Sequence, residues 1–143
     1  MFNPNNPAFS TDGRYMAVTQ HIRVLVEPRF LDSQSDPDSN RYFWAYTIEI
    51  RNEGHETVQL QRRYWEITDG LGEVQYVEGE GVVGEQPVLK PGEAFEYTSG
   101  CPISTQSGFM VGYYKMSSQH GEAFEVNIPA FALDMPSTSR TVN

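Results

Sequence analysis

The chain has 143 residues and a formal net charge of −9, with a sequence pI near 4.7. This length favours one domain with its own core, and the acidic balance makes a nucleic-acid backbone a poor partner for the surface. The single cysteine, Cys101, excludes an intramolecular disulfide and is typical of a reducing compartment. The chain start shows no signal peptide and no window has the apolar length of a membrane span, so we expect a cytoplasmic protein without membrane insertion.

The N-terminal part divides into a polar tail and a first strand. Residues 1–12 contain two prolines and three asparagines, a composition that predicts a flexible tail. Apolar residues of one parity then run from Met16 to Val26, interrupted once by Gln20, and this alternation predicts a single half-buried strand. We expect the strand to end at Pro28, because proline has no amide proton to donate to a ladder.

The strongest strand is expected over residues 41–52, after a turn-rich loop at 30–40. The residues of even parity there predict the centre of the core: Tyr42, Trp44, Tyr46, Ile48 and Ile50. Tyr42, Trp44 and Tyr46 would also suit a stacking platform for single-stranded nucleic acid. The acidic balance and the lack of flanking basic residues favour core packing instead.

The second half of the chain is a series of short strands separated by turns. A slip in apolar parity after Leu60 predicts a β-bulge at 61–63, and turns follow at 68–72 and at Pro91-Gly92. Further strands are expected at 74–77, 95–101, 109–116 and 124–128, and a flexible tail at 134–143. The chain as a whole predicts an all-β fold over residues 13–133: an antiparallel β-sandwich, immunoglobulin- or fibronectin type III-like, without the immunoglobulin disulfide.

A glycine motif stands out between these strands. Gly79, Gly81 and Gly84 have the G-x-G-x-x-G spacing that cradles a pyrophosphate in dinucleotide-binding folds, where a helix must follow the loop. Here Pro87 and a Pro-Gly turn follow instead, and six glutamates surround one lysine over residues 71–96. A structural glycine turn or bulge is therefore the favoured interpretation, and phosphate binding remains an alternative.

The candidate residues for that alternative are the three glycines with Arg62 and Arg63, the densest positive pair in the chain. In a bulged strand one arginine would point toward the glycine loop and neutralise phosphate. The competing interpretation is an arginine that packs its stem over the sheet edge and pairs with a glutamate. In the phosphate-binding alternative no cofactor is needed beyond a divalent cation that bridges phosphate to the acidic loop.

No catalytic constellation emerges from the other reactive residues. Cys101 has no assignable base and is expected to be a small, partly buried residue at a strand end. The histidines lack zinc-type spacing, and the aspartates of the 30–40 loop lack the glutamate of a calcium loop: His21, His55 and His120; Asp32, Asp36 and Asp38. No catalytic residue and no metal ligand set can be assigned, and a non-enzyme is expected.

Several ordered segments resemble the ApaG family of small bacterial proteins. They include I-R-V-L-V-E-P from residue 22, A-Y-T-I-E-I-R-N-E-G from 45, W-E-I-T-D from 65, G-E-G-V-V-G-E-Q-P from 79, P-G-E-A-F-E-Y-T-S-G from 91 and I-P-A-F from 128. The resemblance covers residues 21–133 and implies a fibronectin type III-like sandwich. The longer N-terminus and the C-terminal tail depart from the family pattern.

The resemblance also implies two kinds of function. Family members are associated with cobalt tolerance and magnesium efflux, and the domain resembles a protein-interaction module in a eukaryotic F-box protein and in a partner of DNA polymerase delta. We therefore expect a non-enzymatic binding module with a protein partner, in a pathway touching divalent-cation homeostasis, and a homodimer stays open. The alternative is nucleotide or pyrophosphate binding at the glycine motif, which the family resemblance also suggests, with hydrolysis as its least supported form.

Overall fold

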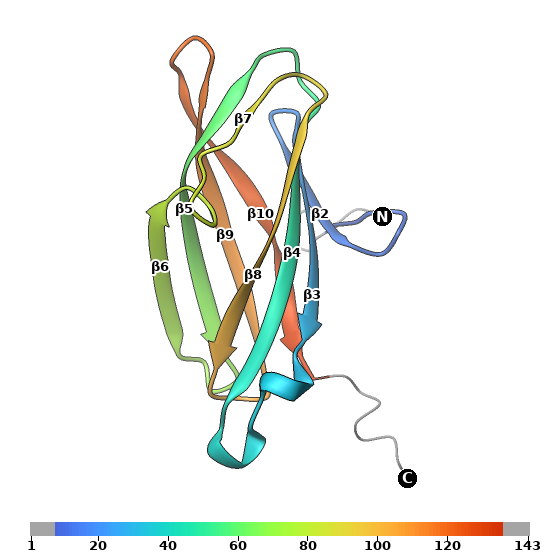
Figure 1. The fold of residues 1–143 in the computed structure, drawn as a ribbon, viewed down its shortest axis with the longest axis vertical. Coiled ribbons are helices and arrows are strands. Elements are labelled where there is room, and N and C mark those ends of the chain that lie inside the picture. The colour runs from blue at the N-terminus through green and yellow to red at the C-terminus, as the bar shows by residue number, and fades with distance from the viewer. Residues whose placement is uncertain (1–7, 136–143) are drawn as a thin grey trace.

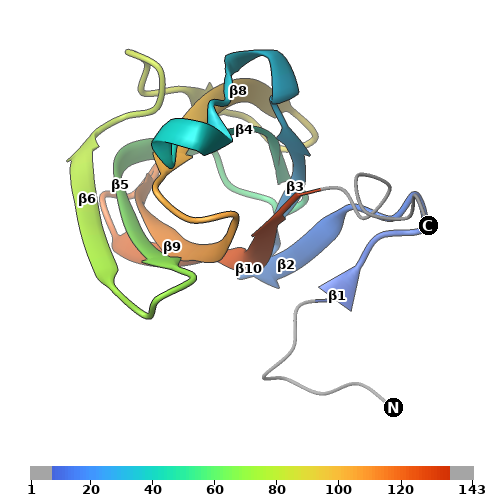
Figure 2. The same ribbon diagram turned by 90° about the horizontal axis from the view of Figure 1, so that it is seen from below.

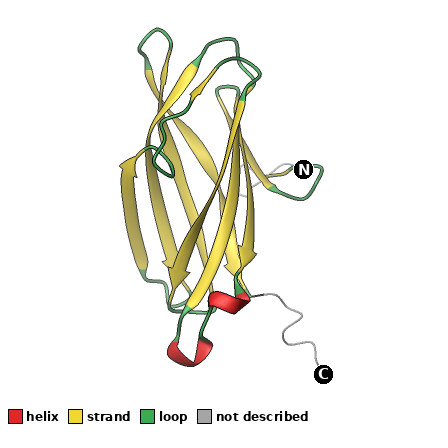
Figure 3. Ribbon diagram, viewed as in Figure 1, coloured by secondary structure: helices red, strands yellow, loops and turns green. Residues whose placement is uncertain are grey.

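The structure is a computed structural model that describes residues 8–135, almost all of them in strands or the turns between strands (Figure 3). Two short 3-10 helices, η1 and η2, lie in the 30–40 loop. The elements are β1 (Ala8–Phe9), β2 (Tyr15–Thr19), β3 (Ile22–Phe30), η1 (Asp32–Gln34), η2 (Pro37–Ser39), β4 (Tyr42–Asn52), β5 (Val58–Asp69), β6 (Val74–Glu80), β7 (Val88–Leu89), β8 (Ala94–Ile103), β9 (Ser107–Ser118) and β10 (Ala123–Asp134). No helix in the described part of the chain is long and apolar enough to cross a membrane.

Two antiparallel sheets form the layers of a β-sandwich (Figures 1 and 2). One sheet has the strand order β1-β2-β3-β4-β8, and the other has the order β10-β9-β5-β6, with β7 paired to the start of β5. The layers meet closely on one side, where β10 packs on β2 and β3. The predicted all-β sandwich, immunoglobulin- or fibronectin type III-like, is confirmed.

The core lies between the sheets, and β4 supplies its centre as its alternation predicts. Trp44, Ile48 and Ile50 are at most 1% exposed, and Tyr46 contacts the ring of Trp65 from the opposite sheet at a centroid distance of 5.4 Å. Tyr42 is partly buried against the same core. Since Tyr42, Trp44 and Tyr46 are all used in packing, they form no exposed stacking platform.

The segment from Met16 to Val26 is a hairpin, so the prediction of one strand there is wrong. Gln20 and His21 have φ of 48° and 68°, the left-handed geometry that both central residues of a type I′ turn require. Thr19 then pairs with Ile22, and β2 folds back on β3. Residues that pair across a two-residue turn share a face but differ in parity, so Met16 and Val18 lie on the opposite face from the core residues of β3. Met16 and Val18 are nevertheless apolar, and Val18 is 49% exposed, so the apolar alternation ran on across the turn and concealed it.

Pro28 does not end its strand, contrary to the prediction, because its nitrogen is not needed for the ladder. The amide of Leu31 donates to the carbonyl of Phe43 at 2.8 Å, which sets the alternation of bonds between β3 and β4. By that alternation Pro28 occupies a position without hydrogen bonds to β4. Its nitrogen faces the β2 side, where β2 begins only opposite Val26. β3 therefore continues to Phe30.

Several turn predictions are confirmed. The register of β5 against β9 shifts between Leu60 and Arg62, where the slip in parity predicted a bulge. The β5–β6 connection closes with the amide of Asp69 bonded to the carbonyl of Glu73, and Gly92 takes a φ of 88° after Pro91. The strand predicted at 74–77 is longer than expected and runs to Glu80, because its ladder with β5 continues through the first glycine of the motif.

At both ends of the chain, regular structure extends into the ranges where the sequence predicts flexible tails. β1 pairs Ala8 with Met16, so regular structure begins inside residues 1–12, where the sequence predicts a flexible tail. At the other end β10 continues through Asp134, the first residue of the expected C-terminal tail. The remaining parts of the two expected tails, residues 1–7 and 136–143, lie outside the described residues.

Candidate functional site

The glycine motif forms the end of β6 and a tight reverse turn. Gly79 lies within the strand, and Gly81 follows it with a φ of 65°. Val82 and Glu85 form a β-bridge, and between them Val83 and Gly84 have φ of 43° and 82°. Two successive left-handed residues define a type I′ turn, and a β-branched residue at the first of them is unusual.

The amides of this turn are largely used inside the protein. Gly81 donates to the carbonyl of Gln61 on β5 at 2.9 Å, and Val82 and Glu85 donate to each other's carbonyls at 2.8 Å. The next element is the short strand β7, whose first residue is Val88, and within residues 8–135 no helix follows the turn. The structure therefore brings to this loop neither the helix dipole nor the converging amides by which dinucleotide-binding loops hold phosphate.

Packing and backbone geometry explain the glycines individually. A Cβ on Gly81 would lie 2.3 Å from the carbonyl oxygen of Glu85, a separation that real Cβ atoms essentially never show. A Cβ on Gly79 would lie 3.0 Å from Nη1 of Arg63. Gly84 has open space around its Cα, and only its positive φ favours glycine. Each glycine thus has a structural reason that involves no ligand.

Arg63 is the arginine that reaches the glycine motif. It lies opposite Tyr114, a core residue, so its side chain starts on the inner face of β5. Its Nη1 donates to the carbonyls of Glu80 and Gly81, at 3.1 and 2.9 Å. Arg63 therefore stabilises the turn through hydrogen bonds from the inner face of the sheet. Of the two arginines that the sequence proposed for phosphate binding, it is the one that reaches the motif.

Arg62 points the other way and is not brought to the motif. It lies opposite Lys115 on the outer face of the sheet, with an Nη2 3.8 Å from a carboxylate oxygen of Glu78. Its guanidinium carbon lies 6.0 Å from the ring centroid of Tyr64. The bulge before Arg62 sets this division, because adjacent strand residues face opposite sides of a sheet.

Cys101 and the tyrosines near it belong to the core. Cys101 is 3% exposed, and burial raises the pKa of its thiol to about 11. The hydroxyls of Tyr97 and Tyr114 share a hydrogen bond of 2.6 Å between the sheets, and burial raises the pKa of both. A thiol held in its protonated form is a poor nucleophile, so the geometry supports the expected structural role of Cys101.

The three histidines gather at one end of the sandwich. His21 and His55 line a cleft of about 580 Å³, and His120 lies 3.9 Å from a carboxylate oxygen of Glu56, which lines the same cleft. Folding thus brings together residues that are far apart in the sequence. Even so, the described residues contain no group of three His, Cys, Asp or Glu side chains placed to hold a metal ion.

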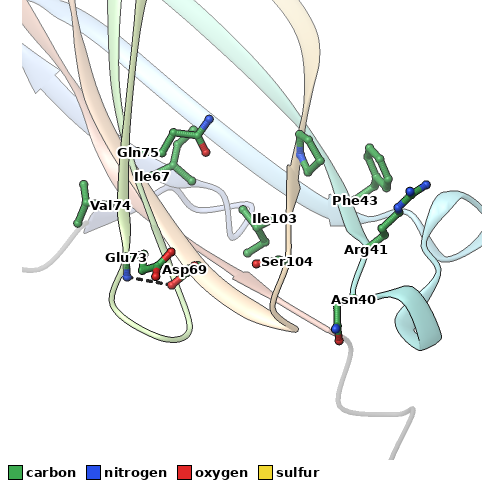
Figure 4. A pocket seen from close by; sticks show the side chains of 11 residues that line it. Asn40, Arg41, Phe43, Ile67, Asp69, Glu73, Val74, Gln75, Ile103 and Ser104 are labelled. Atoms are coloured by element: carbon green, nitrogen blue, oxygen red, sulfur yellow. Dashed lines mark hydrogen bonds between the residues drawn. The ribbon is translucent and has the colours of Figure 1, made fainter.

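A second cleft, of about 530 Å³, opens at the opposite end near η2 (Figure 4). Asn40 and Arg41 line one wall, and Asp69 and Glu73 line the other. The carboxylate of Asp69 accepts hydrogen bonds of 2.9 Å from the amides of Leu71 and Glu73, so it is engaged in closing the β5–β6 turn. This carboxylate is thus committed to turn structure, as in an Asx-turn.

A third cavity was not predicted from the sequence. It is a shallow groove of about 620 Å³ on the outer face of β5, β6 and β9, lined largely by apolar groups. The rings of Tyr64 and Tyr113 stack at 4.6 Å with an interplanar angle of 16°, and Tyr76 is 74% exposed beside them. We call these three tyrosines with Glu66 and Val111 the tyrosine groove.

A sequence signal for the tyrosine groove does exist, in the outward positions of β5. Trp65 and Ile67 identify the inner face of that strand, so Tyr64 and Glu66 are assigned to the outer face by alternation. An aromatic ring on the solvent side of an antiparallel sheet is the observation that would have drawn attention to this face.

The architecture defines a class of protein: a small antiparallel β-sandwich domain, with β6 at one of its sheet edges and an aromatic groove on the outer face of β5, β6 and β9. Comparison with known proteins agrees with this class and refines it. The sequence model of the ApaG domain matches residues 32–118. The Protein ApaG of Bradyrhizobium diazoefficiens is 60% identical over 129 residues, which cover 90% of this chain and 99% of the relative.

Two further relatives agree. The Protein ApaG of Rhodospirillum centenum is 62% identical over 122 residues, covering 85% of this chain and 94% of the relative. The crystal structure of the ApaA protein from Bordetella pertussis superposes with a TM-score of 0.80 at 49% identity, covering 84% of this chain and 98% of that one. The chain therefore belongs to the ApaG family, and the resemblance noted in the sequence is confirmed.

Proposed function

We propose that this protein is a non-enzymatic, cytoplasmic interaction module that binds a protein partner along β6. The observation that carries the proposal is the edge that β6 presents. Among the described strands β6 pairs only with β5; its first three residues are all exposed, and from Tyr76 to Glu80 exposed and half-buried positions alternate. An extended segment of a partner adds to such an edge through main-chain hydrogen bonds.

The hydrogen-bond alternation along β6 identifies the amides that would meet a partner. At the two ends of the ladder Asp69 bonds to Glu73 and Gly81 bonds to Gln61. Counting inward by two, the amides of residues 75, 77 and 79 point to β5. Those of Tyr76 and Glu78 point to the open edge, where a partner strand would accept them.

Glu78→Pro tests the proposal, with Glu78→Ala as the matched control. Proline removes one edge-facing amide without breaking the β5–β6 ladder, and alanine removes only the side chain. We expect a photo-cross-linking residue at position 75 to capture the same partner in cells for the Glu78→Ala protein and to lose it for Glu78→Pro. Equal capture by the two variants would exclude strand addition at β6.

The link to divalent cations is part of the same proposal and rests on family membership. We propose that any effect on cobalt or magnesium runs through the protein partner and not through a metal site on this chain. Calorimetric titration of the isolated protein with Co²⁺ and Mg²⁺ is then expected to show no stoichiometric site. Saturable one-to-one binding would contradict this part.

Nucleotide or pyrophosphate binding is the second candidate function, favoured by the position of Arg63. Its guanidinium lies against Gly79 and reaches Gly81, so one cation is already at the motif. Glu78 and Glu80 on the same strand oppose it by adding negative charge. If the glycine motif binds pyrophosphate, calorimetric titration with pyrophosphate and Mg²⁺ is expected to give a saturable isotherm. The Arg63→Gln variant should abolish this binding, and the Arg62→Gln variant should retain it.

A further inference from the structure

The outer face of the β10-β9-β5-β6 sheet is organised in rows that cross the strands. In one row Tyr113 lies beside Tyr64, and Tyr64 beside Glu78. In the next row Glu66 lies between Val111 on β9 and Tyr76 on β6. A carboxylate is therefore set among apolar and aromatic side chains, which are poor substitutes for its hydration.

Charge on this face is incompletely balanced by the chain itself. Glu66 is half-buried, and the ion pairs among the described residues do not include it. Glu78 has one cationic neighbour, Arg62, at the loose distance of 3.8 Å. Burial first, and then the nearby Glu125, Tyr64 and Glu78, raise the pKa of Tyr113, so two carboxylates act on the stacked rings.

The chain already shows how a cation is held on this surface. The guanidinium of Arg62 lies over the ring of Tyr64, 6.0 Å from its centroid, and beside the carboxylate of Glu78. A ring face and a carboxylate are the two partners that a planar guanidinium prefers. One row further along, Tyr76 and Glu66 offer the same pair of groups beside the groove.

We infer that the tyrosine groove receives an arginine side chain of the protein partner, which stacks on the exposed ring of Tyr76 and pairs with Glu66. This inference rests on the proposed function and adds to it the chemistry of the partner. The occupant is argued from charge complementarity: an uncompensated carboxylate, aromatic walls and a protein of net charge −9. Strand addition at β6 would bring partner side chains over this face, because alternate residues of an added strand point to it.

The experiment uses the full chain labelled with ¹⁵N and a capped Gly-Arg-Arg-Gly peptide, with capped Gly-Gln-Gln-Gly as the neutral control. We expect saturable amide shifts centred on the groove, at Tyr64, Glu66, Tyr76 and Tyr113, for the arginine peptide alone. Glu66→Gln is expected to weaken binding about fivefold, whereas Glu122→Gln, in the cleft at the end of the sandwich, leaves it unchanged. Tyr76→Ser provides a second variant at an exposed position and is expected to weaken binding by a similar factor.

Five results would overturn the inference. The shifts could spread without saturation over the whole acidic surface, or Glu122→Gln could weaken binding as much as Glu66→Gln, and either result means general charge attraction. Saturation of the groove residues by maltotetraose, with the arginine peptide silent, would assign the face to a neutral sugar instead. Loss of the β6 cross-link in Glu78→Pro but not in Glu66→Gln would reject the arginine site and leave the proposed function standing. Persistence of the cross-link in both variants would reject both.

Discussion

The glycine turn and the tyrosine groove lie on the two sides of the same pair of strands and have opposite characters. The glycine turn contains a motif that is conspicuous in the sequence, and most of its polar groups are bonded within the protein, among them the amide and the carbonyl of Gly81. The tyrosine groove contains no motif, yet it exposes an aromatic ring beside a carboxylate that joins no ion pair among the described residues.

A short motif and unused binding capacity are different kinds of evidence for a site. Glycines are required wherever a backbone turns left-handed or passes close to another backbone, and Gly81 meets both conditions. A binding surface instead needs groups that folding leaves with unused capacity, and Glu66 and Tyr76 have it. Substitutions in the two regions test this contrast.

Gly81→Ala is expected to be the most damaging change. Its Cβ would lie 2.3 Å from the carbonyl oxygen of Glu85, and its φ of 65° disfavours any side chain. Overpacking and backbone strain together predict a loss of about 3 kcal/mol in the free energy of unfolding. Gly84→Ala, with a positive φ but open space, is the control and should lose about 1 kcal/mol. Urea denaturation measures both, and equal losses would refute the structural explanation of Gly81.

The two adjacent arginines should also differ in stability. Arg63→Ala removes a guanidinium that donates to the carbonyls of Glu80 and Gly81, and we expect a loss of about 1.5 kcal/mol. Arg62→Ala removes a loose surface ion pair with Glu78, and we expect a loss of about 0.5 kcal/mol at most. Thermal unfolding followed by circular dichroism compares them, and a larger loss for Arg62 would reverse the assignment of the two side chains.

Alkaline pH should lower the free energy of unfolding through the buried thiol of Cys101. Burial raises the pKa of Cys101 from 9.0 to about 11, so below pH 9 its full contribution to stability is present. As the pH rises from 9 through 11 the unfolded chain ionises first and that contribution is lost, about 1 kcal/mol by pH 10. Cys101→Ala should flatten the decline in unfolding free energy over this range. A decline as steep in the variant as in the wild type would show that Cys101 does not contribute.

The smallest stability effect is expected at Tyr76 in the tyrosine groove, and Tyr113 beside it provides the comparison. Tyr113→Ala breaks the stack with Tyr64, whose rings lie 4.6 Å apart, and should lose about 1 kcal/mol. Tyr76→Ala should change stability by less than about 0.5 kcal/mol, because the side chain is 74% exposed. Urea titration of both variants is the measurement. A loss of several kcal/mol for Tyr76→Ala would mean that its ring serves packing and not recognition.

The sequence predicts the fold through its strongest periodicities. The alternation of β4 and the slip in parity at Leu60 suffice for the core strand and the bulge, since both depend on local burial. The hairpin at Gln20 was not found, because its type I′ turn contains neither glycine nor asparagine and because apolar residues on the outer face of β2 continue the alternation of β3. The position of Arg63 depends on the bulge, and sequence alone predicted only that one of the two arginines would reach the motif.

The tyrosine groove depends on cross-strand register, which is why it was missed. Tyr64 and Tyr113 lie on strands that are distant in the sequence, and their contact follows from the pairing of β5 with β9. The register of that pair includes the bulge, so a shift of one residue would place Tyr113 in the core. Long-range pairing of this kind cannot be derived from local alternation.

One titration tests the central claim, that the outer face of β6 binds and the glycine turn is structural. Amide shifts of the ¹⁵N-labelled protein would be followed with pyrophosphate and Mg²⁺, and separately with the arginine peptide. We expect unmoved amides at Gly79, Gly81 and Gly84 with pyrophosphate, and saturable shifts at Glu66 and Tyr76 with the peptide. Saturable shifts at the three glycines with pyrophosphate, and none at the groove with the peptide, would contradict it.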